Sequence, residues 1–141
     1  MRGVLAVLLE TFPYRLMALA HIAAAIVAFG PLIVYPALRR AGDTAVLATT
    51  HMRVTFPALI VLWVLGMGLA GMSEDAYKMS QTWLALSLID WAILVAVSWF
   101  LIRPAISDTS ENAKAKFGAG VGISHLGMVI GLVLMIWKPG I

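Results

Sequence analysis

The chain has 141 residues, of which 62% are hydrophobic and only 12% are charged. Soluble domains are about 45–50% apolar and about 25% charged, so this composition excludes an ordinary water-soluble globule and predicts an integral membrane protein. The sequence has no cysteine, which excludes disulfides, thiolate-bound zinc, iron–sulfur clusters and covalently attached c-type haem. The net charge of +3 fits basic loops beside anionic lipid headgroups and requires no nucleic-acid partner.

Charged residues divide the chain into four long apolar runs separated by short connections. A helix needs about 20 apolar residues to cross about 30 Å of hydrocarbon, so each run is long enough for one crossing. Because the spans leave no room for a soluble domain, we predict one all-α integral membrane domain over residues 1–141. The predicted transmembrane helices cover about 14–38, 53–73, 80–102 and 117–137.

The short connections predict that neighbouring helices are antiparallel, which gives an up-down bundle with both termini on one side. Six Lys and Arg residues lie in connections 39–53 and 103–116, against four on the opposite side. The positive-inside rule therefore places these two connections in the cytoplasm and the termini on the outer face of a cell inner membrane. Residues 2–10 are predicted to form a short interfacial helix, with an uncleaved leader as the alternative.

Several residues mark where helices begin or become irregular. Pro13 suits the first turn of a helix, where its missing N–H costs nothing. Asp43 is a candidate cap for a helix that continues through His51 into the second span, and Ser80 is a candidate cap for the third. Three further prolines release backbone carbonyls inside the spans and are expected to bend them: Pro31, Pro36 and Pro57.

Three ionisable side chains lie within the spans, namely His21, Asp90 and His125. Such residues are costly in a bilayer and are therefore the first candidates for function. His21 and His125 each share a helical face with small residues, which predicts that both face the bundle interior. Counted from the aromatic residues at the span ends, His21 and Asp90 lie at the same depth and could meet, whereas His125 is offset by about 8 Å.

Each candidate also has a structural alternative. Either histidine could simply hydrogen-bond the next helix, and a His21–Asp90 pair could lock the bundle. In the functional interpretation, Asp90 is the catalytic or proton-handling group, and His21 and His125 are metal ligands. Arg53 anchors the membrane interface or holds a carboxylate of a bound ligand. The Gly127-x-x-x-Gly131 motif indicates close helix packing, without a ligand.

The order of several short motifs resembles a known family. His21 precedes Tyr35-Pro-Ala-Leu-Arg39, then Arg53-x-x-x-Pro-Ala, Trp63-x-x-Gly66, Trp83-Leu84 and a closing Met-Ile-Trp-Lys-Pro139. This pattern resembles the HemJ-type protoporphyrinogen oxidases and related small four-helix CopD-like membrane proteins. The resemblance implies haem b held by His21, together with a third-span lysine. That lysine position falls near Ser87, so the resemblance leaves His125 as a substitute ligand, or no haem.

These observations leave three functions open. The first is a haem b-associated redox protein that oxidises porphyrin or transfers electrons, with His21, His125, Asp90 and Arg53 in the roles above. The second is a non-catalytic accessory subunit of a larger respiratory or other membrane complex, or a homo-oligomer. An exposed GxxxG face would favour this second function. The third is a copper or small-solute transporter, which has only scattered Met and His residues behind it.

Overall fold

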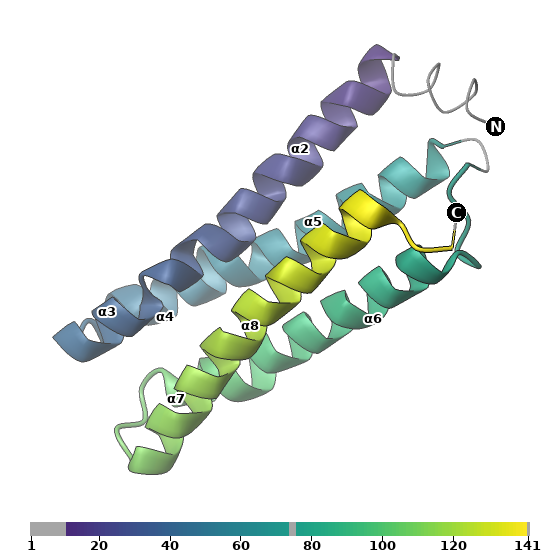
Figure 1. Cartoon of the computed structure of the whole chain (residues 1–141). Coiled ribbons are helices and arrows are strands. Elements are labelled where there is room, and N and C mark those ends of the chain that lie inside the picture. Colours follow the sequence, from purple (N-terminus) through teal and green to yellow (C-terminus); the bar gives the residue numbers. More distant parts are fainter. Residues whose placement is uncertain (1–10, 74–75, 141) are drawn as a thin grey trace.

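The computed structural model describes residues 11–73 and 76–140, and within these ranges it contains helices and no strands (Figure 1). Helical segments join end to end into four rods. The first rod comprises α2 (Phe12–Phe29), η1 (Gly30–Ile33) and α3 (Tyr35–Ala41), and the second comprises α4 (Thr44–Thr50), η2 (His51–Thr55) and α5 (Phe56–Gly71). The third comprises α6 (Thr82–Val97), η3 (Ser98–Ile102) and α7 (Arg103–Ala105), and α8 (Glu111–Trp137) is the fourth.

All four rods are long and apolar enough to cross a membrane, as the composition predicted. They extend beyond the uncharged runs because backbone hydrogen bonding continues through polar residues. The Ser110 side chain accepts a hydrogen bond from the Ala113 N–H at 3.2 Å and starts α8 before its apolar part. The predicted interfacial helix at 2–10 lies outside the described residues.

The predicted helix signals have mixed outcomes. Pro13 lies in the first turn of α2, as expected. Asp43 occupies the position before α4, and the second rod does run from there through His51, but the Asp43 side chain makes no capping hydrogen bond. Ser80 is not the cap of the third rod, because α6 begins after Gln81.

Prolines coincide with the irregular turns. Pro31 lies in the 3₁₀ segment η1, and Pro57 follows η2, which has π-helical hydrogen bonding. Proline has no N–H to donate to the carbonyl four residues earlier, so the helix locally changes its hydrogen-bonding register. Pro104 follows a second π-helical segment, η3, in the same way. Two neighbouring rods thus carry matching irregular turns.

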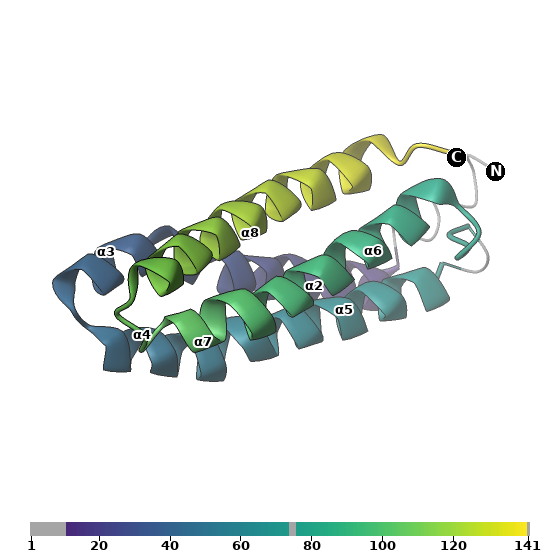
Figure 2. The same cartoon turned by 90° about the horizontal axis from the view of Figure 1, so that it is seen from below.

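The bundle is built from two helix pairs. The closest packing is between α2 and α5 and between α6 and α8. In two perpendicular views, α8 lies near the first rod at the α3 end and separates from α2 toward the end with both termini (Figures 1 and 2). We call residues 28–59 and 94–124 the packed half, and residues 12–27, 60–71, 82–93 and 125–137 the terminal half.

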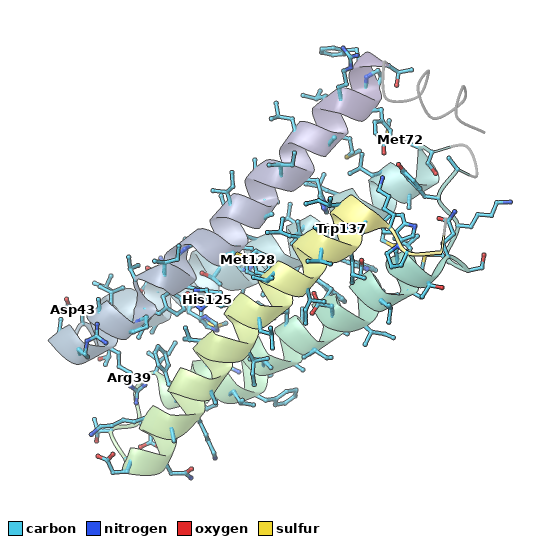
Figure 3. All side chains as sticks on the ribbon, in the orientation of Figure 1. Arg39, Asp43, Met72, His125, Met128 and Trp137 are labelled. Atoms are coloured by element: carbon cyan, nitrogen blue, oxygen red, sulfur yellow. The ribbon has the colours of Figure 1, made fainter. Side chains whose placement is uncertain are left out.

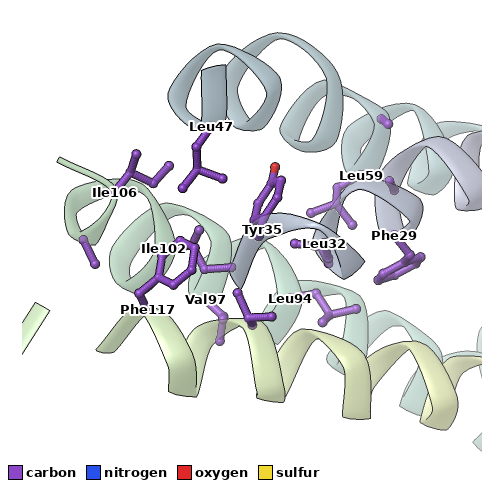
Figure 4. Packing of buried hydrophobic residues seen from close by; sticks show 14 of the residues in the cluster. Phe29, Leu32, Tyr35, Leu47, Leu59, Leu94, Val97, Ile102, Ile106 and Phe117 are labelled. Atoms are coloured by element: carbon purple, nitrogen blue, oxygen red, sulfur yellow. The ribbon is translucent and has the colours of Figure 1, made fainter. Parts of the chain in front are cut away.

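One hydrophobic cluster fills the packed half. Tyr35 lies at its centre, fully buried, and its ring stacks on Phe117 with centroids 6.4 Å apart (Figure 4). Apolar side chains from all four rods surround it, including those of Leu32, Leu47 and Ile102. In contrast, α5 has no buried residue after Leu59. The packed half therefore holds the bundle together by apolar burial, and the terminal half does so much less.

Candidate functional site: two groups of polar side chains

Polar side chains occur in the interior of both halves of the bundle, connected to one another in the packed half and apart from one another in the terminal half. The group in the packed half centres on His51, which is fully buried where η2 faces η3. Its Nδ1 atom lies 3.3 Å from the Tyr35 hydroxyl, and Nε2 lies 3.1 Å from the Ser98 carbonyl oxygen and 3.2 Å from Ser98 Oγ. The Tyr35 hydroxyl donates a hydrogen bond to Thr55 Oγ1 at 2.7 Å. This network joins three rods.

Both ring nitrogens of His51 have a partner when Nδ1 carries the proton. The Tyr35 hydroxyl gives its one proton to Thr55 and accepts from Nδ1–H, and Nε2 then accepts from the Ser98 hydroxyl. A satisfied buried network rigidifies its surroundings and fixes one arrangement of the helices. Its chemistry is structural, because the group is sealed within the hydrophobic cluster.

Sequence reasoning missed this site. His51 lies in Thr49-Thr-His-Met-Arg53, outside the uncharged run of the second span, so it was not among the candidate residues within the spans. One signal was available: the predicted helix from Asp43 through His51 placed this histidine inside a helix rather than in a loop. The π-helical turn that directs it toward Ser98 has no comparable sequence signature.

The first polar residue in the interior of the terminal half is His21 of α2. The ring of His21 sits against Gly66 of α5, where a Cβ atom would lie only 3.0 Å from the histidine Cε1. The imidazole also forms a hydrogen bond with the Leu62 backbone. Even so, His21 Nδ1 is the single buried side-chain nitrogen or oxygen among the described residues that has no hydrogen-bond partner. An unpaired buried nitrogen is costly, which makes it a candidate for ligand binding.

Asp90 faces the other helix pair. A Cβ atom on Gly127 would lie 3.1 Å from Asp90 Oδ1, and one on Gly131 would lie 3.4 Å from Oδ2. The GxxxG motif therefore packs within the chain's own bundle and makes room for this carboxylate. No hydrogen bond to the half-buried Asp90 carboxylate comes from residues 11–73 or 76–140.

The expected direct contact between His21 and Asp90 is not formed. Trp63 and Trp91 stack with centroids 5.2 Å apart, which aligns α5 with α6. Since His21 sits at Gly66 and Asp90 precedes Trp91, the two residues lie within about one helical turn of the same level. His21 and Asp90 thus lie at similar levels along the bundle, but their side chains face different helices, α5 for His21 and α8 for Asp90.

The remaining predicted residues occupy separate places. His125 is half-buried on α8, on the side toward the first rod (Figure 3), and the described part of the chain gives it no hydrogen bond. Arg53 is exposed in η2, thirteen residues and about 20 Å along the rod from Gly66. This separation leaves the predicted pairing of Arg53 with a ligand held at His21 without structural support.

The described residues contain no group of three or more His, Cys, Asp or Glu side chains that could hold a metal ion. Comparison with protein-family models, with curated proteins and with solved structures finds no match to this chain. The polar side chains of the packed and terminal halves are therefore the features that bear on function.

Proposed function

We propose that this is a multi-pass protein of the cell inner membrane, an up-down bundle that binds haem b in its terminal half and works in redox chemistry. The observation that carries the proposal is that Nδ1 of His21 has no hydrogen-bond partner among the described residues, although its ring is packed against Gly66. In this proposal the connections at the α3 and α7 end face the cytoplasm and both termini face outward.

The donor set of the terminal half fits haem b. Imidazole is a common axial ligand of haem iron. His21 Nδ1 has no hydrogen-bond partner, and no hydrogen bond to His125 comes from the described residues. His51, by contrast, has both nitrogens engaged and is unsuited to ligation. His21 and His125 lie on rods that separate toward the terminal end (Figures 1 and 2). When bound, haem b would supply one-electron chemistry.

The other residues have supporting roles in this proposal. Gly66 leaves room for the His21 ring, because a Cβ atom at this position would lie only 3.0 Å from the histidine Cε1. Asp90 is the proton-handling group, since Oδ1 and Oδ2 lie beside Gly127 and Gly131 with no competing hydrogen bond from the described residues. The proposed redox role is porphyrin oxidation or electron transfer, as the resemblance to the HemJ-type enzymes implies.

An absorption spectrum of the protein purified in mild detergent, oxidised and then reduced with dithionite, tests this proposal. We expect a Soret band and sharp reduced α and β bands that His21→Ala abolishes. Loss of the bands in His125→Ala as well would identify the second ligand. Asp90→Asn is the matched control, because it changes a polar residue at the same depth and should keep the bands. A colourless wild-type protein, or bands unaffected by His21→Ala, would refute the proposal.

An accessory subunit is the second candidate, favoured by the low burial of the four rods. Only 17–28% of the most apolar window of each rod is buried within the chain. However, the GxxxG face that would serve docking is used internally, since Gly127 contacts Leu94 and Asp90. A colourless protein that co-purifies in stoichiometric amounts with larger membrane subunits would support this second candidate instead.

A further inference from the structure

A depression of about 440 Å³ is lined by residues of α3 and of the first turns of α8. Figure 1 shows both of these segments at the end of the bundle away from the termini. The depression combines two kinds of lining. Three cationic side chains surround it, Arg39, Arg40 and Lys114. Its other side is apolar and is formed mainly by Phe117, Gly118 and Val121. A site with cations at one edge and apolar surface below suits an amphipathic anion.

Arg39 is held in place without being neutralised by an ion pair. It donates hydrogen bonds to the backbone carbonyls of Ala105 and of Asp108, the latter at 2.9 Å. Its guanidinium carbon also lies 4.6 Å from the centre of the Phe117 ring. Carbonyl oxygens and an aromatic face orient a guanidinium but leave its full charge, so Arg39 presents a fixed positive charge at the depression.

The other two cations are available to a ligand. Arg40 is exposed and forms no ion pair within the described residues. Lys114 pairs with Glu111 at 2.6 Å, but both side chains are largely exposed, at 54% and 89%. An exposed pair contributes little stability, so Lys114 can turn to a phosphate at small cost. Even with the nearby Asp108 and Glu111 carboxylates, three cations face two anions.

The apolar side offers room along α8. A Cβ atom on Gly118 would meet nothing within 4 Å, and the same is true of Gly122 one turn further on. Phe117 is buried and forms the floor of the depression. Gly118 and Gly122 therefore leave two exposed positions, one turn apart, without side chains beside the apolar surface of Phe117 and Val121, and an acyl chain can lie against this surface.

We propose that this depression binds an anionic phospholipid, with the phosphate between Arg39, Arg40 and Lys114 and an acyl chain along Gly118 and Gly122. Basic pockets between helices at the membrane surface recognise such headgroups, and each cation contributes substantially to binding. The inference rests on the membrane placement in the proposed function and is independent of haem. It can therefore hold or fail separately from the redox proposal.

Binding is tested by thermal shift and native mass spectrometry of the detergent-solubilised protein with added phosphatidylglycerol. We expect phosphatidylglycerol to bind and stabilise the protein, and phosphatidylcholine to do so at least tenfold more weakly. Free glycerol phosphate separates the two sources of phosphate. It should bind weakly because it has no acyl chain, and binding as tight as that of the lipid would overturn the lipid assignment.

Two variants separate the charged and apolar parts of the site. Arg40→Gln combined with Lys114→Gln should weaken phosphatidylglycerol binding at least tenfold and leave the fold intact, because both side chains are exposed. Gly118→Leu keeps every charge but fills the depression, and it should also weaken binding about tenfold. Arg39 is left unchanged because its backbone contacts tie α3 to the connection before α8.

Matched controls exist for both variants. Lys116→Gln removes one exposed positive charge two residues from Lys114 but outside the depression, and Gly71→Leu adds a side chain at an open glycine in α5. Neither should change binding by more than about twofold. If Lys116→Gln matched the double variant, or if Gly118→Leu bound normally, a defined site would be refuted in favour of diffuse surface attraction.

Discussion

The two halves of the bundle hold their histidines in opposite ways. In the packed half, His51 is fully buried and bonded through both ring nitrogens to Tyr35 and Ser98. In the terminal half, His21 is half-buried, and its Nδ1 has no partner in the described chain. One histidine completes a hydrogen-bond network, whereas the other has one ring nitrogen that the described residues leave unsatisfied.

This difference shows that burial between the rods alone does not identify a functional histidine. Both residues are expensive to bury, but the cost of His51 is offset by hydrogen bonds that tie η2 to η3. The described chain offsets the cost of burying His21 only through the Leu62 backbone and leaves Nδ1 unpaired, so stability gives little reason for a histidine at this position. A ligand would give one.

The largest expected effect is the difference in stability between two single variants of the haem-free protein, His51→Leu and His21→Leu. His51→Leu removes hydrogen bonds to two rods and leaves the Tyr35 hydroxyl without its imidazole partner, so we expect a loss of about 2–3 kcal/mol in the free energy of unfolding. His21→Leu removes an unsatisfied nitrogen, and its effect should stay within about 1 kcal/mol.

Unfolding in mixed detergent and denaturant, followed by circular dichroism, measures both variants. Tyr35→Phe is a milder control for His51, because it removes only the hydroxyl and should cost about 1–2 kcal/mol. Equal losses for His51→Leu and His21→Leu would contradict the division of the bundle into a satisfied and an unsatisfied half.

A smaller effect is expected from glycines on α8. A Cβ atom on Gly127 would lie 2.6 Å from Leu94 Cδ2, and Leu94 belongs to the buried cluster and cannot easily move. Gly127→Ala should therefore cost about 1–2 kcal/mol. Gly122→Ala places its methyl group in open space and should be neutral or stabilising by up to about 1 kcal/mol.

Thermal unfolding compares these two alanine variants directly. Gly131→Ala sharpens the comparison, because its Cβ atom would make only an ordinary contact of 3.4 Å with Asp90 Oδ2 and should cost less than Gly127→Ala. If all three variants were equally stable, the tight α6–α8 packing at Gly127 would be disproved.

The smallest effect is expected at the connection before α8. The Ser110 N–H donates to Asp108 Oδ1 at 2.8 Å and, with the nearby Arg39, lowers the pKa of this exposed carboxyl. A carboxyl whose pKa is lower in the folded chain stabilises the fold above its unfolded pKa, and this stabilisation disappears as the pH falls through the folded value.

Asp108→Asn should therefore slightly flatten the dependence of the melting temperature on pH between about pH 2 and 5, with almost no change in melting temperature at lower pH. Wild-type protein and the variant are compared across this range in one detergent. A variant that shifts the melting temperature equally at every pH would show that charge at Asp108 plays no part.

Much of the fold could be predicted from the sequence. Apolar runs of bilayer length fixed the number of rods, because a chain in hydrocarbon must satisfy its backbone within helices or closed barrels. The prolines at 31 and 57 indicated where the rods become irregular, since the missing N–H is a local property. The candidate residues His21 and Asp90 were likewise evident, because a polar residue in an apolar run is visible without a structure.

The tertiary structure alone decided which of these residues meet. The depth of His21 and Asp90 follows from counting along a helix, but the pairing of α2 with α5 and of α6 with α8 depends on how whole helix surfaces fit together. The same packing buried His51 and turned it toward Ser98 through two π-helical turns. Local sequence determines where a side chain lies along its rod, whereas contacts between distant segments determine what it faces, and therefore whether a histidine is structural or free to bind.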